Sequence, residues 1–199
     1  MSHSDSHPDL ILASGSRYRR LMLERFGVAF TVVPADIDET PQLTETGEML
    51  ARRLASDKAA KVSEMNSEAI VIGCDQVAEC DGRLLGKPGN AQNALEQLVF
   101  TAGKEVVFHS AMTLRRGRKQ DTINVPTFIR MRSLSISTFQ RYLERDQPYD
   151  CAGSMRSESL GIALTEYIRS DDPSALIGLP MIELAKRLMD YGIDVFSDA

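Results

Sequence analysis

The sequence predicts an α/β protein built on a mixed, twisted sheet flanked by helices. Two observations predict this class. Apolar strand-like runs alternate with amphipathic helix-like segments in the first half of the chain, and hairpin turns interrupt that alternation after residue 80. Alternation favours parallel strands, whereas a tight hairpin joins antiparallel ones, so the sheet is expected to contain both.

The expected elements follow from apolar periodicity and from residues typical of turns and caps. In the first half they are a strand at 10–13, a Ser-Gly-Ser turn at 14–16, a helix from 18 to 26, a strand at 30–34, a helix at 47–65 and a buried strand at 69–73 that delivers residues 74–76 at its carboxyl end. In the second half they are an Asp-Gly turn at 80–82, a helix from the Asn90 cap to Phe100, paired strands at 105–114 and 122–131, a helix capped by Ser137, a strand-like run at 160–168 and a final helix that begins at 178–180.

Length and composition favour a single folded unit. At 199 residues the chain can bury one substantial core, and we expect a single domain over residues 9–199 preceded by a disordered polar tail at 1–8. No apolar run approaches the roughly 20 residues that a membrane span requires, and the tail lacks the apolar centre of a signal peptide. No membrane partner is therefore expected.

Charge and cysteine content narrow the functional class. A formal net charge of -5 argues against a general nucleic-acid binder, which needs a basic face. The three cysteines, Cys74, Cys80 and Cys151, form no CxxC pair and leave one over, so neither a zinc site nor a disulfide framework is expected. This cysteine usage suits the reducing cytoplasm.

Basic residues crowd the start of the first predicted helix. Each of Arg17, Arg19 and Arg20 is unfavourable there by about 0.3 to 1 kcal/mol unless an anion is bound nearby, because a helix N-terminus is itself positive. With free backbone N–H groups and the hydroxyls of Ser14 and Ser16, they predict an oxyanion cradle for phosphate. The spacing is not that of a Walker A loop, and a surface helix with solvated arginines is the alternative.

Two lysines are further candidates for binding an anion. Lys58 lies in the middle of the apolar stripe of the predicted helix at 47–65. An unpaired buried ammonium is strongly destabilising, so this lysine either snorkels to water or meets a negative partner. Lys87 lies between Gly86 and Pro88, which hold its backbone, and its sequence context leaves the same two possibilities open.

Carboxylates gather at two positions. Asp36, Asp38 and Glu39 share one predicted loop, and Asp75 follows a buried strand, where open α/β sheets usually bind ligands. Two carboxylates from separate segments suit a hard divalent ion such as Mg²⁺ or Mn²⁺. The acidic loop is also typical of a solvated turn, and Asp75 of a structural acceptor.

The segment 151–158 is small, polar and able to wrap a ligand. It ends at Glu158, with Arg156 nearby. Cys151 lacks a histidine partner, since His109 lies in a strand-like run, so we do not expect a cysteine nucleophile.

Taken together, these residues resemble the Maf family of nucleotide pyrophosphatases. The likeness runs from Leu10 to nearly the last helix and rests on motifs in the family's order: LILASGSRYRR, DIDET, LASDKA, IGCDQV, GKP, CAGSMRSES and IGLP. The opening signature usually carries a serine pair followed by Pro-x-Arg-Arg, and Arg17 replaces that proline here.

The resemblance implies hydrolysis of a nucleoside triphosphate between the α and β phosphorus atoms, with a divalent cation. It also implies a Maf/ITPase-like fold, two-lobed with a central cleft. By position, the catalytic aspartate is Asp75, and the specificity residues are Tyr18, Gln76 and Glu158. For this reaction we expect Glu39 and Asp75 to hold the metal, and the sequence does not decide whether Asp75 is general base, metal ligand or both. We expect the triphosphate to be bound by Ser14, Ser16, Arg19, Arg20, Lys58 and Lys87.

The finer pattern resembles the subfamily that acts on 7-methyl-GTP. N7-methylation gives the purine a positive charge, which an aromatic ring such as Tyr18 attracts by roughly 0.5 to 2 kcal/mol. Glu158 is suited to accept hydrogen bonds from the guanine N1 and N2 edge. Tyr18 stands where tryptophan is frequent and Ser159 where glycine is common, and both departures bear on substrate preference.

Other functions remain open from sequence. One is the same reaction on dTTP or UTP, against which the carboxylate of Glu158 speaks. Another is a nucleotide-binding regulator of cell division without turnover, and a third is a cytosolic interaction domain, which leaves Lys58 unexplained. The sequence does not decide between a monomer and a homodimer.

Overall fold

The computed structural model describes residues 9–197, and its centre is one mixed seven-stranded sheet. The strand order is β2-β1-β3-β5-β6-β7, with β4 paired to β3. The strands are β1 (Leu10–Ala13), β2 (Thr31–Val32), β3 (Ile70–Cys80), β4 (Arg83–Leu85), β5 (Glu105–Arg116), β6 (Lys119–Met131) and β7 (Thr165–Ser170). The first three are parallel and the other pairings antiparallel, so the predicted mixed sheet is confirmed. The tail expected at 1–8 lies outside the described residues.

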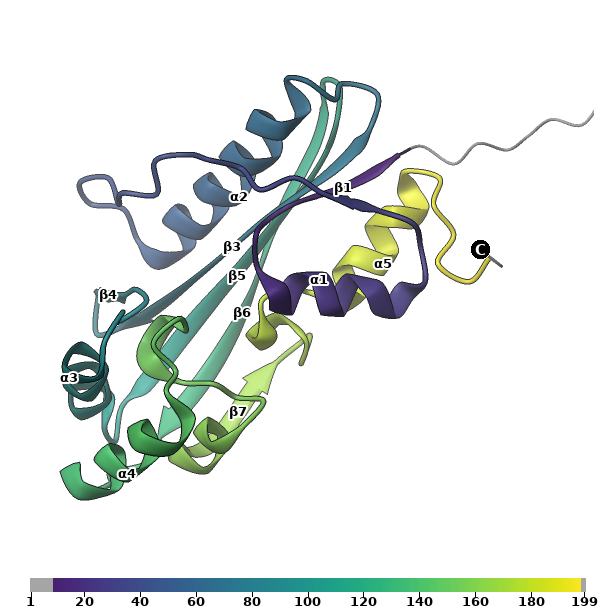
Figure 1. Cartoon of the computed structure of the whole chain (residues 1–199). Coiled ribbons are helices and arrows are strands. Elements are labelled where there is room, and N and C mark those ends of the chain that lie inside the picture. Colours follow the sequence, from purple (N-terminus) through teal and green to yellow (C-terminus); the bar gives the residue numbers. More distant parts are fainter. Residues whose placement is uncertain (1–8, 198–199) are drawn as a thin grey trace, which may run out of the picture.

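In the described part of the chain, five α-helices cover this sheet: α1 (Arg17–Leu23), α2 (Gly47–Ser63), α3 (Ala91–Thr101), α4 (Ile136–Asp146) and α5 (Met181–Asp190). Figure 1 shows α2 on one side of the long strands, α1 and α5 on the other, and α3 and α4 together at the end of the sheet near β7. Among the described residues, no helix has the length and apolar character needed to cross a bilayer.

On the face of the sheet opposite α2, the hydrophobic core divides between the two ends of the sheet, and two smaller clusters pack α2 on the other face. One cluster joins α3 and α4 to the strands through Leu98, Phe108 and Phe139. A second cluster joins α1 and α5 to β1 and β3 through residues such as Met22 and Leu184. This division agrees with the two-lobed architecture expected from the family likeness, and it leaves a position for a cleft between the lobes.

Local signals placed several boundaries correctly. Cys80 pairs with Arg83 across a two-residue turn, and both turn residues have positive φ, 48° at Asp81 and 74° at Gly82. Asp-Gly is favoured in such turns because aspartate tolerates this region and glycine has no Cβ. Asn90 caps α3 by accepting from the backbone N–H of Asn93, as predicted.

The strand predicted to end at residue 73 instead continues through Cys80. β5 pairs with β3 from Val71 to Glu79 and keeps it extended. On the opposite edge, pairing with β1 stops at Gly73 and pairing with β4 starts at Ala78. The predicted end of β3 is therefore the point where its pairing with β1 ends. Residues 74–77 form the part of this edge of β3 that lies between β1 and β4.

Three other boundaries were also wrong. The strand expected at 30–34 is reduced to β2, and the 160–168 run begins as a 3-10 helix (Leu160–Leu164) before β7. Helix α4 is capped by Ser135 rather than Ser137, because the Ser135 hydroxyl accepts from the N–H of Thr138.

Candidate active site

A pocket of about 670 Å³ opens over the edge of β3 between the two core clusters. Its wall includes Phe108 and Met155 from the α3/α4 cluster and Ile177, which packs against the α1/α5 cluster. It brings together nine residues expected from sequence to form a site: Ser14, Ser16, Tyr18, Arg19, Glu39, Lys58, Gln76, Lys87 and Glu158.

The pocket reaches both faces of β3, because successive side chains of a strand point to opposite sides. Asp75 points toward α2, where its Oδ1 accepts a hydrogen bond from Lys58 Nζ. Gln76 points to the other face, where its amide nitrogen bonds backbone carbonyls of the segment that precedes α5. The edge of β3 therefore separates a charged side of the pocket from a side lined by Gln76.

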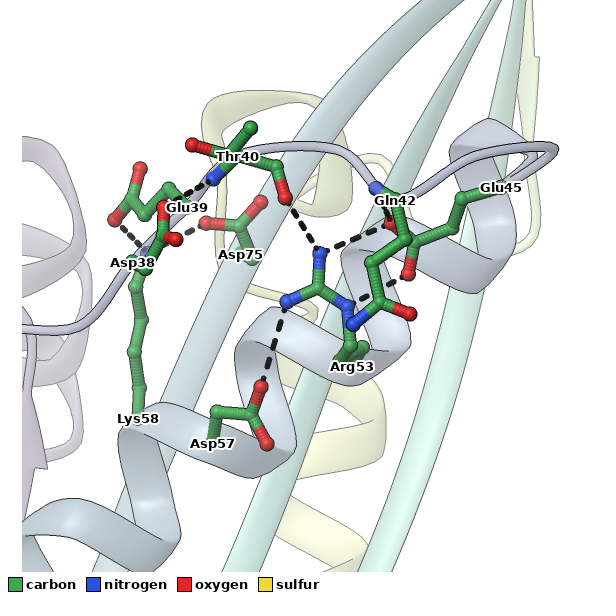
Figure 2. A network of polar contacts seen from close by, with 9 residues as sticks. All are labelled: Asp38, Glu39, Thr40, Gln42, Glu45, Arg53, Asp57, Lys58 and Asp75. Atoms are coloured by element: carbon green, nitrogen blue, oxygen red, sulfur yellow. Dashed lines mark hydrogen bonds and ion pairs between the residues drawn. The ribbon is translucent and has the colours of Figure 1, made fainter.

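On the charged side, one lysine bridges two carboxylates. Lys58 Nζ lies 2.6 Å from Glu39 Oε1 and 2.6 Å from Asp75 Oδ1, as Figure 2 shows. Lys58 is only 7 % exposed, so the misplaced charge on the helical wheel is resolved by negative partners rather than by snorkelling. Burial raises the pKa of Glu39, but the hydrogen bond and the charge of Lys58, together with the charges of Lys87 and Arg19, hold this pKa below its ordinary value.

A glycine in β3 allows α2 to lie close enough for this bridge. A Cβ at Gly73 would lie 2.2 Å from the carbonyl oxygen of Ala55 and 2.6 Å from the nitrogen of Ala59. These residues flank Lys58 on α2. The backbone contact at Gly73 thus brings the lysine next to Asp75, two residues along the strand.

The loop that carries Glu39 is tied to the same helix. Arg53 of α2 donates from Nε to Glu45 Oε1 at 2.7 Å and from Nη2 to the Thr40 carbonyl at 3.1 Å. In the loop itself, Asp38 Oδ1 accepts from the Thr40 N–H at 2.9 Å. Figure 2 shows this network beside the Lys58 bridge. The loop that carries Glu39 is therefore bonded to α2, the helix that carries Lys58.

At the β1–α1 turn, Arg19 joins three segments of the chain. It donates to Ser14 Oγ at 3.2 Å, to the Cys74 carbonyl at 2.9 Å and to the Gly178 carbonyl at 2.9 Å. Ser16 caps α1, since its hydroxyl accepts from the Arg19 N–H at 3.4 Å. Arg19 thus helps to build the pocket, in addition to lining it.

The structure does not bring every predicted cation into the pocket. Arg20 is exposed and pairs with Glu24 at 2.9 Å, outside the pocket lining. One residue along a helix turns a side chain by about 100°, and in the direction of Arg20 this turn leads away from the pocket, whereas Tyr18 on the other side of Arg19 still lines it. Lys87 lies on the pocket wall, and with Lys58 and Arg19 it lowers the pKa of Glu39.

The other end of the pocket is open. Tyr18 is half-buried and Glu158 is exposed, and the Arg17 guanidinium lies 5.6 Å from the Tyr18 ring centroid. Arg156 donates to Asp150 Oδ1 at 3.1 Å. Burial raises the pKa of the Cys151 thiol to about 11, which agrees with the expectation that it is no nucleophile.

Sequence reasoning missed several groups that line the pocket or support its lining residues. Phe108 carries no local signal that separates it from a core residue. Ser110 does carry a local signal, because its hydroxyl lies within the apolar run of β5. Like the misplaced charge of Lys58, a buried hydroxyl requires a polar partner. The carbonyls of Ala175 and Leu176 also gave no signal, because every residue has this group.

The carboxylate pair fits a divalent cation chemically. Within residues 9–197, no three His, Cys, Asp or Glu side chains gather in a way that could hold a metal ion. Mg²⁺ is commonly held by one or two carboxylates, with water and substrate phosphates completing its shell. Glu39 and Asp75, which share the Lys58 ammonium, are a donor set of this kind.

The site places lysine and arginine side chains beside paired carboxylates, at an open strand edge of an α/β sheet. This arrangement is typical of a class of proteins that bind anionic substrates such as phosphates. The chain belongs to the family described as Maf-like proteins, whose model matches residues 9–191.

Similar proteins of known name cover nearly the whole chain. A protein of Bordetella pertussis named 7-methyl-GTP pyrophosphatase is 48% identical over 187 residues, 94% of this chain and 94% of that protein. A protein of Burkholderia orbicola with the same name is 50% identical over 191 residues, 92% of this chain and 91% of that one. A solved structure of the Staphylococcus aureus Ham1 protein matches with a TM-score of 0.47 at 14% identity, over 63% of this chain and 72% of that chain.

Proposed function

We propose that the protein is a nucleoside triphosphate pyrophosphatase that hydrolyses 7-methyl-GTP to 7-methyl-GMP and pyrophosphate. The names of relatives at 48% and 50% identity support this activity. The observation that carries it in the molecule is the Lys58 bridge between Glu39 and Asp75. Lys58 and Glu39 line the pocket whose other end holds Tyr18 and Glu158, and the buried Asp75 contacts this lining through Lys58.

The charged side of the pocket is suited to the triphosphate. Lys58, Arg19 and Lys87 supply positive charge, and the hydroxyls of Ser14 and Ser16 supply hydrogen bonds. Positioning and neutralisation of charge dominate catalysis of phosphoryl transfer, so these groups account for much of the expected rate.

The open side is suited to the base. The ring of Tyr18 attracts the positive charge of an N7-methylated purine, and the carboxylate of Glu158 accepts from the guanine N1 and N2 edge. A pyrimidine triphosphate offers neither feature in that arrangement, which favours 7-methyl-GTP over dTTP and UTP.

In the chemical step, the oxygen of a water molecule forms a bond to the α-phosphorus. The bond from that phosphorus to the bridging oxygen breaks, pyrophosphate leaves with the electron pair, and Asp75 accepts the proton of the water. A carboxylate base contributes on the order of 10² to 10⁴ in rate. A divalent cation held by Glu39 and Asp75 would neutralise charge on the phosphate oxygens.

The proposed setting is the cytoplasm, where such an enzyme would remove modified nucleotides from the pool before polymerases use them. The three cysteines are free thiols in the described structure, which is consistent with a reducing compartment.

The test is product analysis. The purified protein is incubated with 7-methyl-GTP, GTP, dTTP and UTP in the presence of Mg²⁺ or Mn²⁺, beside an Asp75→Asn variant. We expect 7-methyl-GMP and pyrophosphate from the wild type, and a rate lower by about 10² or more from the variant. Release of orthophosphate would contradict the cleavage position. Preference for dTTP or UTP would select the pyrimidine enzyme, and binding without any product would select the regulator.

A further inference from the structure

A buried hydroxyl on β5 contacts Gln76, which lines the pocket. Ser110 is 0% exposed and lies between the apolar side chains of Phe108 and Met112 on the same face of the strand. A polar group in such a place costs stability unless it is hydrogen-bonded. Its Oγ donates to the Ala175 carbonyl at 2.6 Å and lies 2.9 Å from Gln76 Nε2, from which it accepts.

Gln76 is directly opposite this serine in the β3–β5 register, and its amide nitrogen is surrounded by acceptors. Nε2 lies 2.9 Å from Ser110 Oγ, 3.0 Å from the Ala175 carbonyl and 2.9 Å from the Leu176 carbonyl. Reversing the amide would place Oε1 against two carbonyl oxygens, which cannot donate. The hydrogen-bond network therefore permits one orientation of the amide.

The segment that supplies these carbonyls is itself held in place. The buried side chain of Asp172 accepts from the N–H groups of Ser174 and Ile182, at 2.9 Å and 2.8 Å. Arg19 donates to the Gly178 carbonyl on the other side of the segment, at 2.9 Å. The frame around Gln76 Nε2 is thus assembled before any substrate binds.

The remaining polar atom of Gln76 is Oε1, which only accepts hydrogen bonds. Gln76 lines the pocket, and its nitrogen is directed toward Ser110 and the 175–176 carbonyls, so the oxygen is the atom that the side chain offers on the opposite side.

We propose that Ser110 is a positioning residue for substrate selection: with the 175–176 carbonyls it fixes Gln76, which then presents only an acceptor to the nucleotide. This rests on the proposed function. The matching substrate group is a hydrogen-bond donor, either the exocyclic amine of the base or a ribose hydroxyl. A nucleotide without that donor leaves Oε1 desolvated and unpaired, which disfavours its binding.

The test compares Ser110→Ala with Thr113→Val. Thr113 is also 0% exposed on β5 and bonds the Thr122 hydroxyl at 2.8 Å, on the face away from Gln76, so it controls for loss of a buried hydroxyl. Each protein is assayed for kcat/KM with 7-methyl-GTP, with 7-methyl-ITP, which lacks the amine, and with the 2′-deoxy and 3′-deoxy forms of 7-methyl-GTP.

We expect Ser110→Ala to lower kcat/KM for 7-methyl-GTP by about 3- to 10-fold, the worth of one hydrogen bond, and to leave unchanged the value for the one analogue that lacks the matching donor. Thr113→Val should lower all four values by one common factor. A common factor for Ser110→Ala as well would overturn the proposal. If that variant does not fold, Ser110→Cys, which retains a weak donor of similar size, is scored in the same way.

The two proposals fail separately. If the wild type does not hydrolyse 7-methyl-GTP, the proposed function fails. The Ser110 comparison is then made by calorimetric binding of the nucleotide that the wild type binds best and of its deaminated and deoxy analogues. Selective loss of affinity in Ser110→Ala supports the positioning role, and uniform loss contradicts it.

Discussion

The two faces of β3 carry different kinds of polar side chain. Toward α2, Lys58 is already paired with Glu39 and Asp75, at 2.6 Å from each. On the other face, Gln76 is fixed by its nitrogen alone, and Glu158 at the open end is exposed to water. A buried charge must be neutralised inside the protein, whereas an exposed one is solvated.

From this difference we propose separate tasks for the two sides. A triphosphate that enters the charged side exchanges contacts with groups that are already satisfied, so part of its interaction energy is offset. The base enters a side where Tyr18 and Gln76 are partly exposed and Glu158 is exposed, so its contacts replace contacts with solvent. We therefore expect turnover to depend mainly on the charged side and discrimination among nucleotides mainly on the open side.

The largest effect is expected on the charged side. Lys58→Met leaves two carboxylates without their shared partner and removes a cation from the proposed phosphate site, so kcat/KM should fall by about 10² to 10³. The matched control is Lys61→Met, an exposed lysine one turn further along α2 that pairs only with Glu64 among the described residues. Steady-state kinetics and thermal unfolding of both variants give the comparison. Equal kinetics would contradict the assignment.

A smaller and more selective effect is expected on the open side. Glu158→Gln should lower kcat/KM for 7-methyl-GTP by about 10-fold relative to GTP, because a hydrogen bond to a charged acceptor is lost where the base carries positive charge. Glu166→Gln, at an exposed position on β7, should change neither rate. An unchanged ratio in Glu158→Gln would show that another group reads the methylated base.

The smallest effect concerns a polar group on the α2 face that lies away from the pocket. His109 Nε2 lies 3.9 Å from Glu79 Oε2, which accepts from the Gly47 N–H at 2.6 Å, and Asn124 bonds its Nδ1 at 3.2 Å. Burial lowers the pKa of His109 below 6.5, although Glu79 and Glu48 oppose this shift.

The unfolded chain therefore takes up this proton at a higher pH than the native protein does. Stability should be full above the ordinary histidine pKa and should decrease as the pH falls below it. Urea unfolding at about pH 7.5 and about pH 5.5 should show a smaller decrease for His109→Gln than for the wild type. An equal decrease in both would assign the pH dependence to other groups.

The two faces of β3 also show which site residues could be predicted from the sequence. Lys58 broke the apolar period of its helix, and a charge in such a place demands a partner, so its role in the site could be expected. Asp75 and Gln76 broke the pattern of a strand in the same way and were taken for the strand's end. These polar residues stay within the strand because β5 pairs with β3 from Val71 to Glu79. This pairing depends on the tertiary fold and cannot be recognised from the local sequence pattern.

Neighbouring arginines show a second limit. Arg19 and Arg20 belong to one motif, yet Arg19 bonds three segments of the pocket while Arg20 pairs with Glu24 on the surface. Helix geometry separates them by about 100°, and the direction of the pocket depends on where β3 and the Gly178 segment lie. The sequence predicts that an anion is bound there, but not which arginine faces it.

The most direct measurement is a crystal structure of the Asp75→Asn variant with 7-methyl-GTP bound. We expect the nucleotide to cross the edge of β3, with its phosphates beside Lys58 and the 14–16 turn and its base between Tyr18 and Glu158. A nucleotide bound on one face of β3 only, or with its base beside Lys58, would contradict the division of the pocket into a charged side and an open side.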